Sequence, residues 1–268
     1  MAKKHKSKHG DANAVIGIDI GGTGIKGGIV DLTKGKLIGE RFRIPTPQPA
    51  TPEAVAGVVG QIVAELSSRP GGPGPEVPVG VTFPAIIQHG VARSAANVDD
   101  SWIGTDVDTL LTKALGRDVQ VMNDADAAGL AEARYGAGRE VDGTVLVITL
   151  GTGIGSALIY KGMLVPNAEL GHLEIDGYDA ESRASASARE RDDISWEEYA
   201  KRLQRYFSHV EFLFSPDLFV VGGGISKRSE DFLPLLDLRT PLVTANLKNN
   251  AGIVGAALQA AMHFKYIS

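Results

Sequence analysis

Two segments far apart in this sequence share one pattern, in which an apolar strand runs into a glycine-rich turn and a second apolar strand follows. The first segment is Val15–Lys26 and the second is Val145–Ser156. Consecutive glycines let backbone N–H groups turn toward an anion with no side chain in the way. The repetition predicts a chain of two similar α/β halves, each led by antiparallel strands, with two turns suited to binding phosphate.

The spacing of apolar residues extends this prediction along the chain. Strands are expected at 15–20, 25–31, 36–44, 79–83, 119–122, 144–150, 154–160 and 218–221. Helices are expected at 51–66, 106–115, 124–135, 195–214 and 251–264. Two of these helices carry clear N-terminal signals, Thr51 before a proline and Ser195 with Glu198 three residues later as a capping box.

These elements divide the chain into two expected lobes. A basic tail is expected at 1–13, a smaller N-terminal lobe at 14–122 and a larger C-terminal lobe at 123–250, with the helix at 251–268 closing the first lobe. Ligands of such sheets bind at strand ends, where the loops gather. We therefore expect a binding cleft between the lobes.

Composition narrows the class of protein. The chain has 268 residues, 43% of them hydrophobic, a formal net charge of −5 and no cysteine. The absence of cysteine excludes disulfides and thiolate zinc sites, and it fits the reducing cytoplasm. No apolar run approaches the ~20 residues of a membrane span, so no membrane partner is expected.

The charges are unevenly distributed along the chain. The first ten residues contain four lysines and two histidines. They predict a solvated, disordered tail or, alternatively, an electrostatic lure for a polyanion such as polyphosphate. The remainder is acidic, which argues against nucleic acid as the main partner.

The first turn carries groups that phosphoryl transfer needs. Its N–H donors, hydroxyl and cation come from Gly21, Gly22, Thr23, Gly24 and Lys26. Asp19, at the strand end, is a candidate to hold Mg²⁺ through water. The second turn offers Gly151, Thr152 and Gly153, and a third strand-end cluster follows at Gly222, Gly223 and Gly224. Such turns also occur in plain hairpins, but three of them favour phosphate binding.

Two further motifs have open interpretations. Asp124, after a strand and at the start of a helix, is either a helix cap or a general base for a substrate hydroxyl. Glu169 and His172 lie in a short glycine-containing turn. They suit the hydroxyls of a polyol. A metal site and a plain surface turn are the alternatives, and the metal is the weaker one because no second histidine or cysteine lies at ligand spacing.

Together these motifs resemble the ROK family of sugar kinases and repressors, within the actin-like ATPase superfamily. The resemblance spans about residues 14 to 264 and rests on five motifs in order: Ile18-Asp19-Ile20-Gly21-Gly22-Thr23, Asn123-Asp124-Ala125-Asp126-Ala127, Gly151-Thr152-Gly153-Ile154-Gly155, Glu169-Leu170-Gly171-His172 and Val221-Gly222-Gly223-Gly224-Ile225. It implies the two-lobed actin-like (RNase H-like) α/β fold, with duplicated mixed sheets flanked by helices and a cleft between the lobes.

More narrowly, Arg93–Val98, Ser101–Thr105 and Asn123–Gly138 resemble the actinobacterial polyphosphate glucokinases of that family. The resemblance implies that Asp124 is the base toward the C6 hydroxyl of glucose, and of mannose. The residues implied to hold the other hydroxyls are Asn97, Asn123, Glu169 and His172, with Glu181 placed by spacing alone. Mg²⁺ is the implied cofactor, and polyphosphate, ATP or both are the implied donors.

One departure from the family matters for His172. Many members follow this motif with a cysteine-rich zinc loop, but Gly177–Arg191 contains no cysteine. No zinc site is therefore expected, and His172 is left for sugar contact.

The donor and the partners have alternatives. A strictly ATP-dependent glucokinase is one alternative, and a non-catalytic sugar-binding regulator is another, although family repressors carry a DNA-binding domain before the first motif. A homodimer is an open possibility, because relatives are often dimers. A polyphosphate chain needs a basic track, for which the candidates are Arg134, Arg139, Lys161, Lys201, Arg202 and Arg205.

Overall fold

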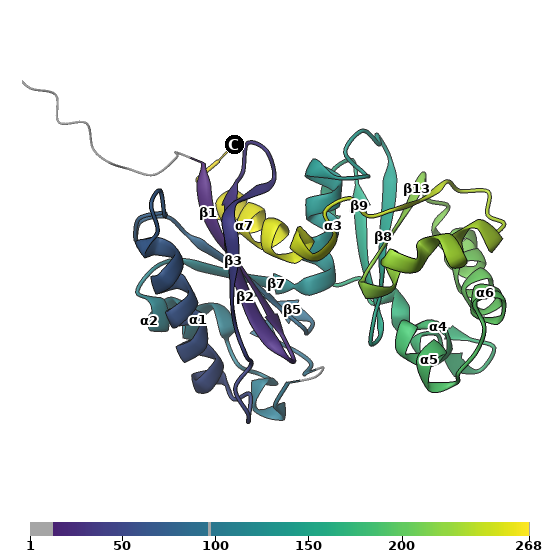
Figure 1. The fold of residues 1–268 in the computed structure, drawn as a ribbon, viewed down its shortest axis with the longest axis horizontal. Helices are drawn as coiled ribbons and strands as arrows, with labels where there is room; N and C mark the ends of the chain where they lie inside the picture. Colours follow the sequence, from purple (N-terminus) through teal and green to yellow (C-terminus); the bar gives the residue numbers. More distant parts are fainter. Residues whose placement is uncertain (1–12, 96–97, 268) are drawn as a thin grey trace, which may run out of the picture. The chain divides into compact units, whose positions relative to one another are not determined.

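The structure is a computed structural model that describes residues 13–95 and 98–267 (Figure 1). Asn97 and residues 1–12 of the predicted tail lie outside the described residues. The chain forms two compact units. Unit 1 contains the residues up to Met122 and those from Ala256 onward, and unit 2 is Asn123–Gly255.

Unit 1 is built on a five-stranded mixed sheet with the order β3-β2-β1-β4-β7. Its strands are β1 (Ala14–Gly21), β2 (Gly24–Asp31), β3 (Lys36–Ile44), β4 (Val79–Phe83) and β7 (Val119–Asn123), and its longer helices are α1 (Pro52–Ser68) and α2 (Val107–Leu115). A small hairpin, β5 (Ile87–Gln88) and β6 (Val91–Ala92), and a short helix, η1 (Asp100–Trp102), complete the unit. The strands β1, β2 and β3 are antiparallel, whereas β4 runs parallel to β1.

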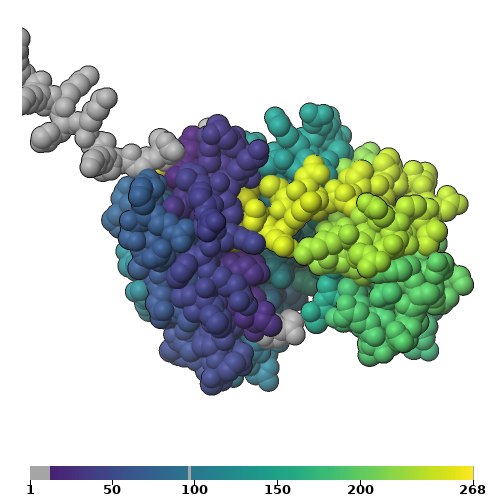
Figure 2. Space-filling model, in the orientation of Figure 1, coloured from purple at the N-terminus to yellow at the C-terminus, as the bar shows by residue number. Residues whose placement is uncertain are grey.

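Helices cover both faces of this sheet. Val79 and Val81 of β4 belong to the core that β1, α1 and α2 share. Gly80 between them faces the other side, because alternate residues of a strand point to opposite faces. There an added Cβ would lie 1.8 Å from Ala256 O of α7 (Ala251–His263), so the glycine lets α7 approach the sheet. Figure 2 shows the surface of this unit, to which β3 and α1 contribute on the side facing the viewer.

Unit 2 repeats the arrangement, with the sheet order β10-β9-β8-β13-β14. Its strands are β8 (Thr144–Leu150), β9 (Ile154–Tyr160), β10 (Met163–Val165), β13 (Leu218–Gly222) and β14 (Leu242–Thr244), and its helices are α3 (Asp124–Tyr135), α4 (Glu181–Ala184), α5 (Ala186–Arg191) and α6 (Trp196–Phe214). Short elements fill the loops: η2 (Leu170–His172), β11 (Glu174–Ile175), β12 (Tyr178–Asp179), η3 (Gly224–Asp231), η4 (Leu233–Leu235) and η5 (Lys248–Asn250).

The core of unit 2 also lies on both faces of its sheet. Leu146 and Ile148 of β8 pack with α6, whereas Val145 and Val147 pack on the α3 side. Gly129 of α3 would place an added Cβ 2.2 Å from Ala157 Cβ of β9, so its lack of a side chain sets how closely α3 packs. In each unit an antiparallel three-strand group is extended by two further strands, and the first of these, β4 or β13, runs parallel to its neighbour.

The predicted duplication and the α/β class with mixed sheets flanked by helices are confirmed. Each glycine turn joins the first two strands of its sheet, β1 to β2 and β8 to β9. The short elements of unit 2 between 163 and 191 were not predicted, because two to six residues are too few to show a hydrophobic period. Within the residues that the structure describes, no helix combines the length and apolarity needed to span a bilayer.

Candidate active site

The first glycine turn is preceded by a fixed carboxylate. Thr82 Oγ1 of β4 donates to Asp19 Oδ1 at 2.9 Å, and Lys26 Nζ of β2 lies 3.4 Å from Asp19 Oδ2. The backbone of β1 and β2 is paired up to Gly21 and Gly24, so Gly22 and Thr23 form the tip of the turn. A carboxylate has lone pairs beyond these two contacts. The remaining lone pairs of the Asp19 carboxylate fit Mg²⁺, which prefers oxygen ligands and keeps several waters.

Arg43 of β3 adds a second cation to this turn, beside Lys26. Its Nη2 donates to Thr23 O at 2.9 Å. The guanidinium occupies the space beside Gly24, where an added Cβ would lie 2.4 Å from Arg43 Nε. No sequence motif singles out Arg43, because it is one of several charged residues in the edge strand β3.

The second glycine turn is closed by a carboxylate from another segment. Glu181 Oε2 accepts from Ile154 N at 2.9 Å, and Gly151 N donates to Gly153 O at 3.0 Å. An added Cβ at Gly153 would lie 2.3 Å from Glu181 Oε2, whereas one at Gly151 would have no described atom within 4 Å. Thr152 between them is exposed. The turn is therefore packed at Gly153 and accessible at Gly151.

The third glycine cluster lies against the end of the strand that leads into the second turn. β13 runs parallel to β8, with Gly222 opposite Thr149. Gly223 has a φ of 86°, which favours glycine, and an added Cβ there would lie 2.3 Å from Leu150 O. Gly224 begins η3. Two of the three predicted phosphate-binding clusters are thus neighbours within unit 2.

The structure shows which of Asn123 and Asp124 is the N-cap of α3. Asn123 is the N-cap of α3, and its side chain accepts from Ala125 N at 2.8 Å and from Asp126 N at 3.1 Å. Asp124 Oδ1 also accepts from Ala125 N, at 2.8 Å, and the residue is exposed. Because Asn123 Oδ1 serves the helix, a sugar contact by Asn123 would use its Nδ2 group.

Asp126, one position beyond Ala125, is a buried carboxylate at the same helix start. Its Oδ2 accepts from Asn167 N at 2.8 Å, and no described group pairs with Oδ1. Burial raises the pKa of Asp126 to about 7; the Asn167 hydrogen bond opposes this, and the charges of Glu169 and Asp124 add to it. The contact ties α3 to the loop that leads to Glu169. The sequence pattern presents Asp126 only as part of a helix.

The turn that carries Glu169 and His172 is fixed on β9. Ser156 Oγ, buried on β9, accepts from Leu170 N at 2.8 Å. An added Cβ at Gly171 would lie 2.2 Å from a backbone oxygen of β9. The glycine of the motif therefore allows the close approach that places Glu169 and His172 beside the second glycine turn.

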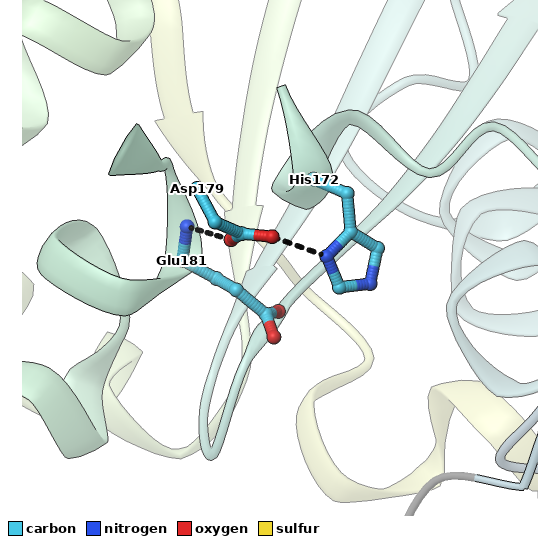
Figure 3. A group of neighbouring side chains, drawn as sticks. All are labelled: His172, Asp179 and Glu181. Carbon is cyan, nitrogen blue, oxygen red and sulfur yellow. Dashed lines mark hydrogen bonds and ion pairs between the residues drawn. The ribbon is translucent and has the colours of Figure 1, made fainter. Parts of the chain in front are cut away.

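His172, Asp179 and Glu181 lie together at this turn (Figure 3). His172 Nδ1 is 2.9 Å from Asp179 Oδ2, and Glu181 N donates to Asp179 Oδ1 at 3.1 Å. Asp179 was not predicted as a site residue. Among the described residues, these three offer possible metal ligand atoms within 4.8 Å of one another.

The candidate sugar-binding residues of unit 2 influence one another's ionisation. Burial raises the pKa of Glu169, the charge of His172 lowers it, and the charge of Glu181 raises it. The hydrogen bond to Asp179 raises the pKa of His172, burial opposes this, and the charges of Glu181, Asp179 and Glu169 contribute to the rise. A close group of carboxylates and one imidazole can both donate to and accept from several hydroxyls.

The cations predicted for a polyphosphate track are only partly gathered. Three of them line a cavity of about 240 Å³ together with Arg183. Each is paired with an acidic side chain: Lys201 with Glu198, Arg202 with Asp192, and Arg205 with Asp176. The other candidates, Arg134, Arg139 and Lys161, do not line it. The pairing offsets the positive charge, so this cavity is not favoured as a polyanion track.

Comparison with known proteins shows which family this chain resembles in sequence. The model of the ROK family matches residues 15–190. The polyphosphate glucokinase of Mycobacterium tuberculosis (strain CDC 1551 / Oshkosh) is 53% identical over 244 residues, which cover 91% of this chain and 89% of that protein.

Two solved structures are similar along almost their whole length. The inorganic polyphosphate/ATP-glucomannokinase from Arthrobacter sp. strain KM is 74% identical with a TM-score of 0.89, covering 93% of this chain and 99% of that one. The ROK family glucokinase from Streptomyces griseus in complex with glucose and AMPPNP is 26% identical with a TM-score of 0.78 and the same coverage. The family model matches more than half of this chain, and a curated relative is 53% identical over 91% of it. The chain therefore belongs to the ROK family.

Proposed function

We propose that this protein is a sugar kinase that transfers a phosphoryl group from inorganic polyphosphate or ATP to the C6 hydroxyl of glucose. The observation that carries the proposal is the hydrogen bond from Ile154 N to Glu181, because it joins a candidate sugar-binding carboxylate to the second glycine turn. The names of the relatives support this activity: a polyphosphate glucokinase, a polyphosphate/ATP-glucomannokinase and a glucokinase in complex with glucose and AMPPNP.

In this proposal Asp124 is the general base. Asn123 caps α3, so the helix does not depend on Asp124 for its cap. The N–H of Ala125 orients the Asp124 carboxylate, and the positive end of the helix dipole favours a negative charge there. An ordinary carboxylate is a weak base, so the proton of the C6 hydroxyl moves to Asp124 late, as the new O–P bond forms.

The remaining hydroxyls of the sugar are assigned to other side chains of unit 2 and to Asn97. Asn123 donates through Nδ2, Glu169 and Glu181 accept, and His172 uses the ring nitrogen that does not face Asp179. Glucose and mannose differ only at C2, where one hydrogen bond contributes about 1 kcal/mol. We therefore propose mannose as a second substrate.

On the donor side, the glycine turns bind phosphate oxygens through backbone N–H groups. Gly151–Gly153 and Gly222–Gly224 serve the donor chain, and Gly21–Gly24 with Lys26 serves the transferred phosphate. Asp19 would hold Mg²⁺, which supplies positive charge against the donor phosphates when it is bound. Arg43, fixed on the first turn, adds a cation there.

The donor experiment tests the proposal directly. Purified protein is given glucose and Mg²⁺ with either ATP or polyphosphate as the only donor, and glucose 6-phosphate is measured by coupled oxidation. We expect product from both donors. Product from ATP alone would reduce the proposal to a strictly ATP-dependent glucokinase, and glucose binding without product from either donor would make the protein a sugar-binding regulator.

The base assignment has its own variant. Asp124→Asn is expected to lower kcat by several orders of magnitude while KM for glucose changes little, because the shape and the contact with Ala125 N are kept. Asp142→Asn, an exposed carboxylate of the same unit, is the matched control and should leave kcat unchanged. Turnover of Asp124→Asn near that of the control would reject Asp124 as the base.

Location and assembly complete the proposal. The absence of cysteine supports a location in the reducing cytoplasm. Three consecutive apolar residues, Phe212, Leu213 and Phe214, are exposed at the end of α6. Exposed apolar groups of this kind occur at protein interfaces. They support a homodimer, which light scattering tests against the 28.2 kDa mass of one chain.

A further inference from the structure

The two ring nitrogens of His172 have different surroundings. Nδ1 lies 2.9 Å from Asp179 Oδ2. Since a carboxylate oxygen accepts, the hydrogen of this pair belongs to Nδ1. Figure 3 shows the other nitrogen, Nε2, on the side of the ring away from Asp179. In the neutral ring, Nε2 is then an acceptor, which suits a hydroxyl donor.

Asp179 is itself held in place. It ends β12, whose pairing with β11 places it opposite Glu174. Glu181 N donates to Asp179 Oδ1 at 3.1 Å, and Ser182 Oγ donates to the backbone oxygen of Asp179 at 2.6 Å. One carboxylate oxygen thus serves a backbone N–H and the other serves the imidazole. Rotation of the carboxylate would break both bonds, so Asp179 is a stable partner for His172.

We infer that Asp179 is a positioning residue of the sugar site, whose carboxylate fixes the Nδ1–H tautomer of His172 and directs Nε2 toward a sugar hydroxyl. This inference rests on the proposed function. Partners of this kind on the second ring nitrogen set both tautomer and orientation of a histidine. Without the Asp179 carboxylate, the Nε2–H tautomer becomes available, and the ring meets a hydroxyl with a donor in place of an acceptor.

A bound metal ion is the alternative for this group, because its ligand atoms are close enough together. The observed contacts favour hydrogen bonding. His172 Nδ1 already faces Asp179, and Glu181 Oε2 already accepts from Ile154 N. A metal held through His172 Nδ1 would have to replace the hydrogen bond with Asp179.

Asp179→Asn is the variant that separates orientation from folding. The Asn side chain keeps the shape, and its carbonyl oxygen can still accept from Glu181 N. Its NH₂ group then faces His172 Nδ1 and donates to it, which selects the opposite tautomer. We expect KM for glucose to rise about tenfold while kcat changes less than about threefold.

A double-mutant cycle with His172→Ala shows whether the effect passes through the histidine. In the His172→Ala background, Asp179→Asn should change KM for glucose by less than about twofold. Asp176→Asn, at the turn of the same hairpin and paired with Arg205, is the matched control and should leave KM unchanged. A tenfold rise in KM in the His172→Ala background would overturn the inference.

The tautomer is read directly from ¹H–¹⁵N spectra of the histidine rings at alkaline pH, with His172 assigned by its loss in His172→Ala. We expect Nδ1–H in the wild type and Nε2–H in Asp179→Asn. Nε2–H in the wild type would overturn the inference, as would an Asp179-dependent shift of these signals on adding Zn²⁺ or Mg²⁺. Absence of glucose phosphorylation by the wild type would instead reject the proposed function, whatever the tautomer.

Discussion

Replacing Asp126 by asparagine tests how the burial of one carboxylate shapes the pH dependence of stability. Asp126 is 2% exposed and accepts from Asn167 N at 2.8 Å. Burial is the main cause that raises its pKa from 3.8 to about 7. Asparagine has the same shape and can accept the same hydrogen bond, but it does not titrate.

The sign follows from which state holds the proton. Between about pH 4 and pH 7, Asp126 is protonated in the folded protein and ionised in the unfolded chain, so folding takes up a proton. The contribution of Asp126 to the free energy of unfolding therefore falls by about 1.4 kcal/mol per pH unit in this window. The whole window corresponds to about 4 kcal/mol, a large part of the 5–15 kcal/mol that typically stabilises a domain. Below pH 4 this contribution is fully present, and above pH 7 it is lost.

The assay is urea unfolding of the wild type and of Asp126→Asn from pH 5 to pH 8, monitored by tryptophan fluorescence. Trp196 lies in unit 2, the unit that contains Asp126. The free energy of unfolding of Asp126→Asn minus that of the wild type should increase by about 3 kcal/mol from pH 5 to pH 8. Asp142→Asn, at an exposed carboxylate, should show a difference from the wild type that does not change with pH. If the Asp126→Asn difference is as flat as that of the control, the argument from burial is wrong.

Two glycine variants follow from close contacts. In Gly80→Ala the new Cβ would lie 1.8 Å from Ala256 O, a backbone atom that cannot move without shifting α7. We therefore expect the free energy of unfolding, measured with urea, to fall by about 3 kcal/mol. A fall below about 0.5 kcal/mol would contradict this argument. In Gly153→Ala the new Cβ would lie 2.3 Å from Glu181 Oε2, the end of a flexible side chain. Stability should therefore change by less than about 1 kcal/mol, whereas KM for glucose should rise about tenfold, and an unchanged KM would separate Glu181 from the sugar site.

The duplicated hairpins and the main helices could be predicted because their signals are local. Strand alternation and glycine turns predicted β1, β2, β8 and β9. Ser195 accepts from Glu198 N at 3.2 Å, as a capping box requires, and Thr51 caps α1 in the same way. A complete capping box also needs the Glu198 carboxylate to accept from Ser195 N. In the described structure this carboxylate instead lies 3.1 Å from Lys201 Nζ.

The supporting residues of the site could not be predicted, because their partners are distant in sequence. Thr82 looks like an ordinary strand residue until β4 pairs with β1 and brings its hydroxyl to Asp19. Asp126 looks like a helix residue until the loop at Asn167 returns to α3. Asp179 lies in a two-residue strand, too short for any period to mark it. The contacts of these three residues depend on strand register or on where a loop packs, and the local spacing of residue types does not encode either.

With the proposed function, the segment from β11 to α4 predicts that sugar binding and donor binding depend on each other. Asp179 contacts both His172 and the backbone of Glu181, and Glu181 in turn accepts from Ile154 N at the second glycine turn. A shift of any one of these groups changes the geometry of the next, because each hydrogen bond uses an atom of the same short chain of contacts. Substitutions in this chain should therefore be non-additive. A change at Gly153, in the turn that we propose for the donor, is expected to appear first in the KM for the sugar.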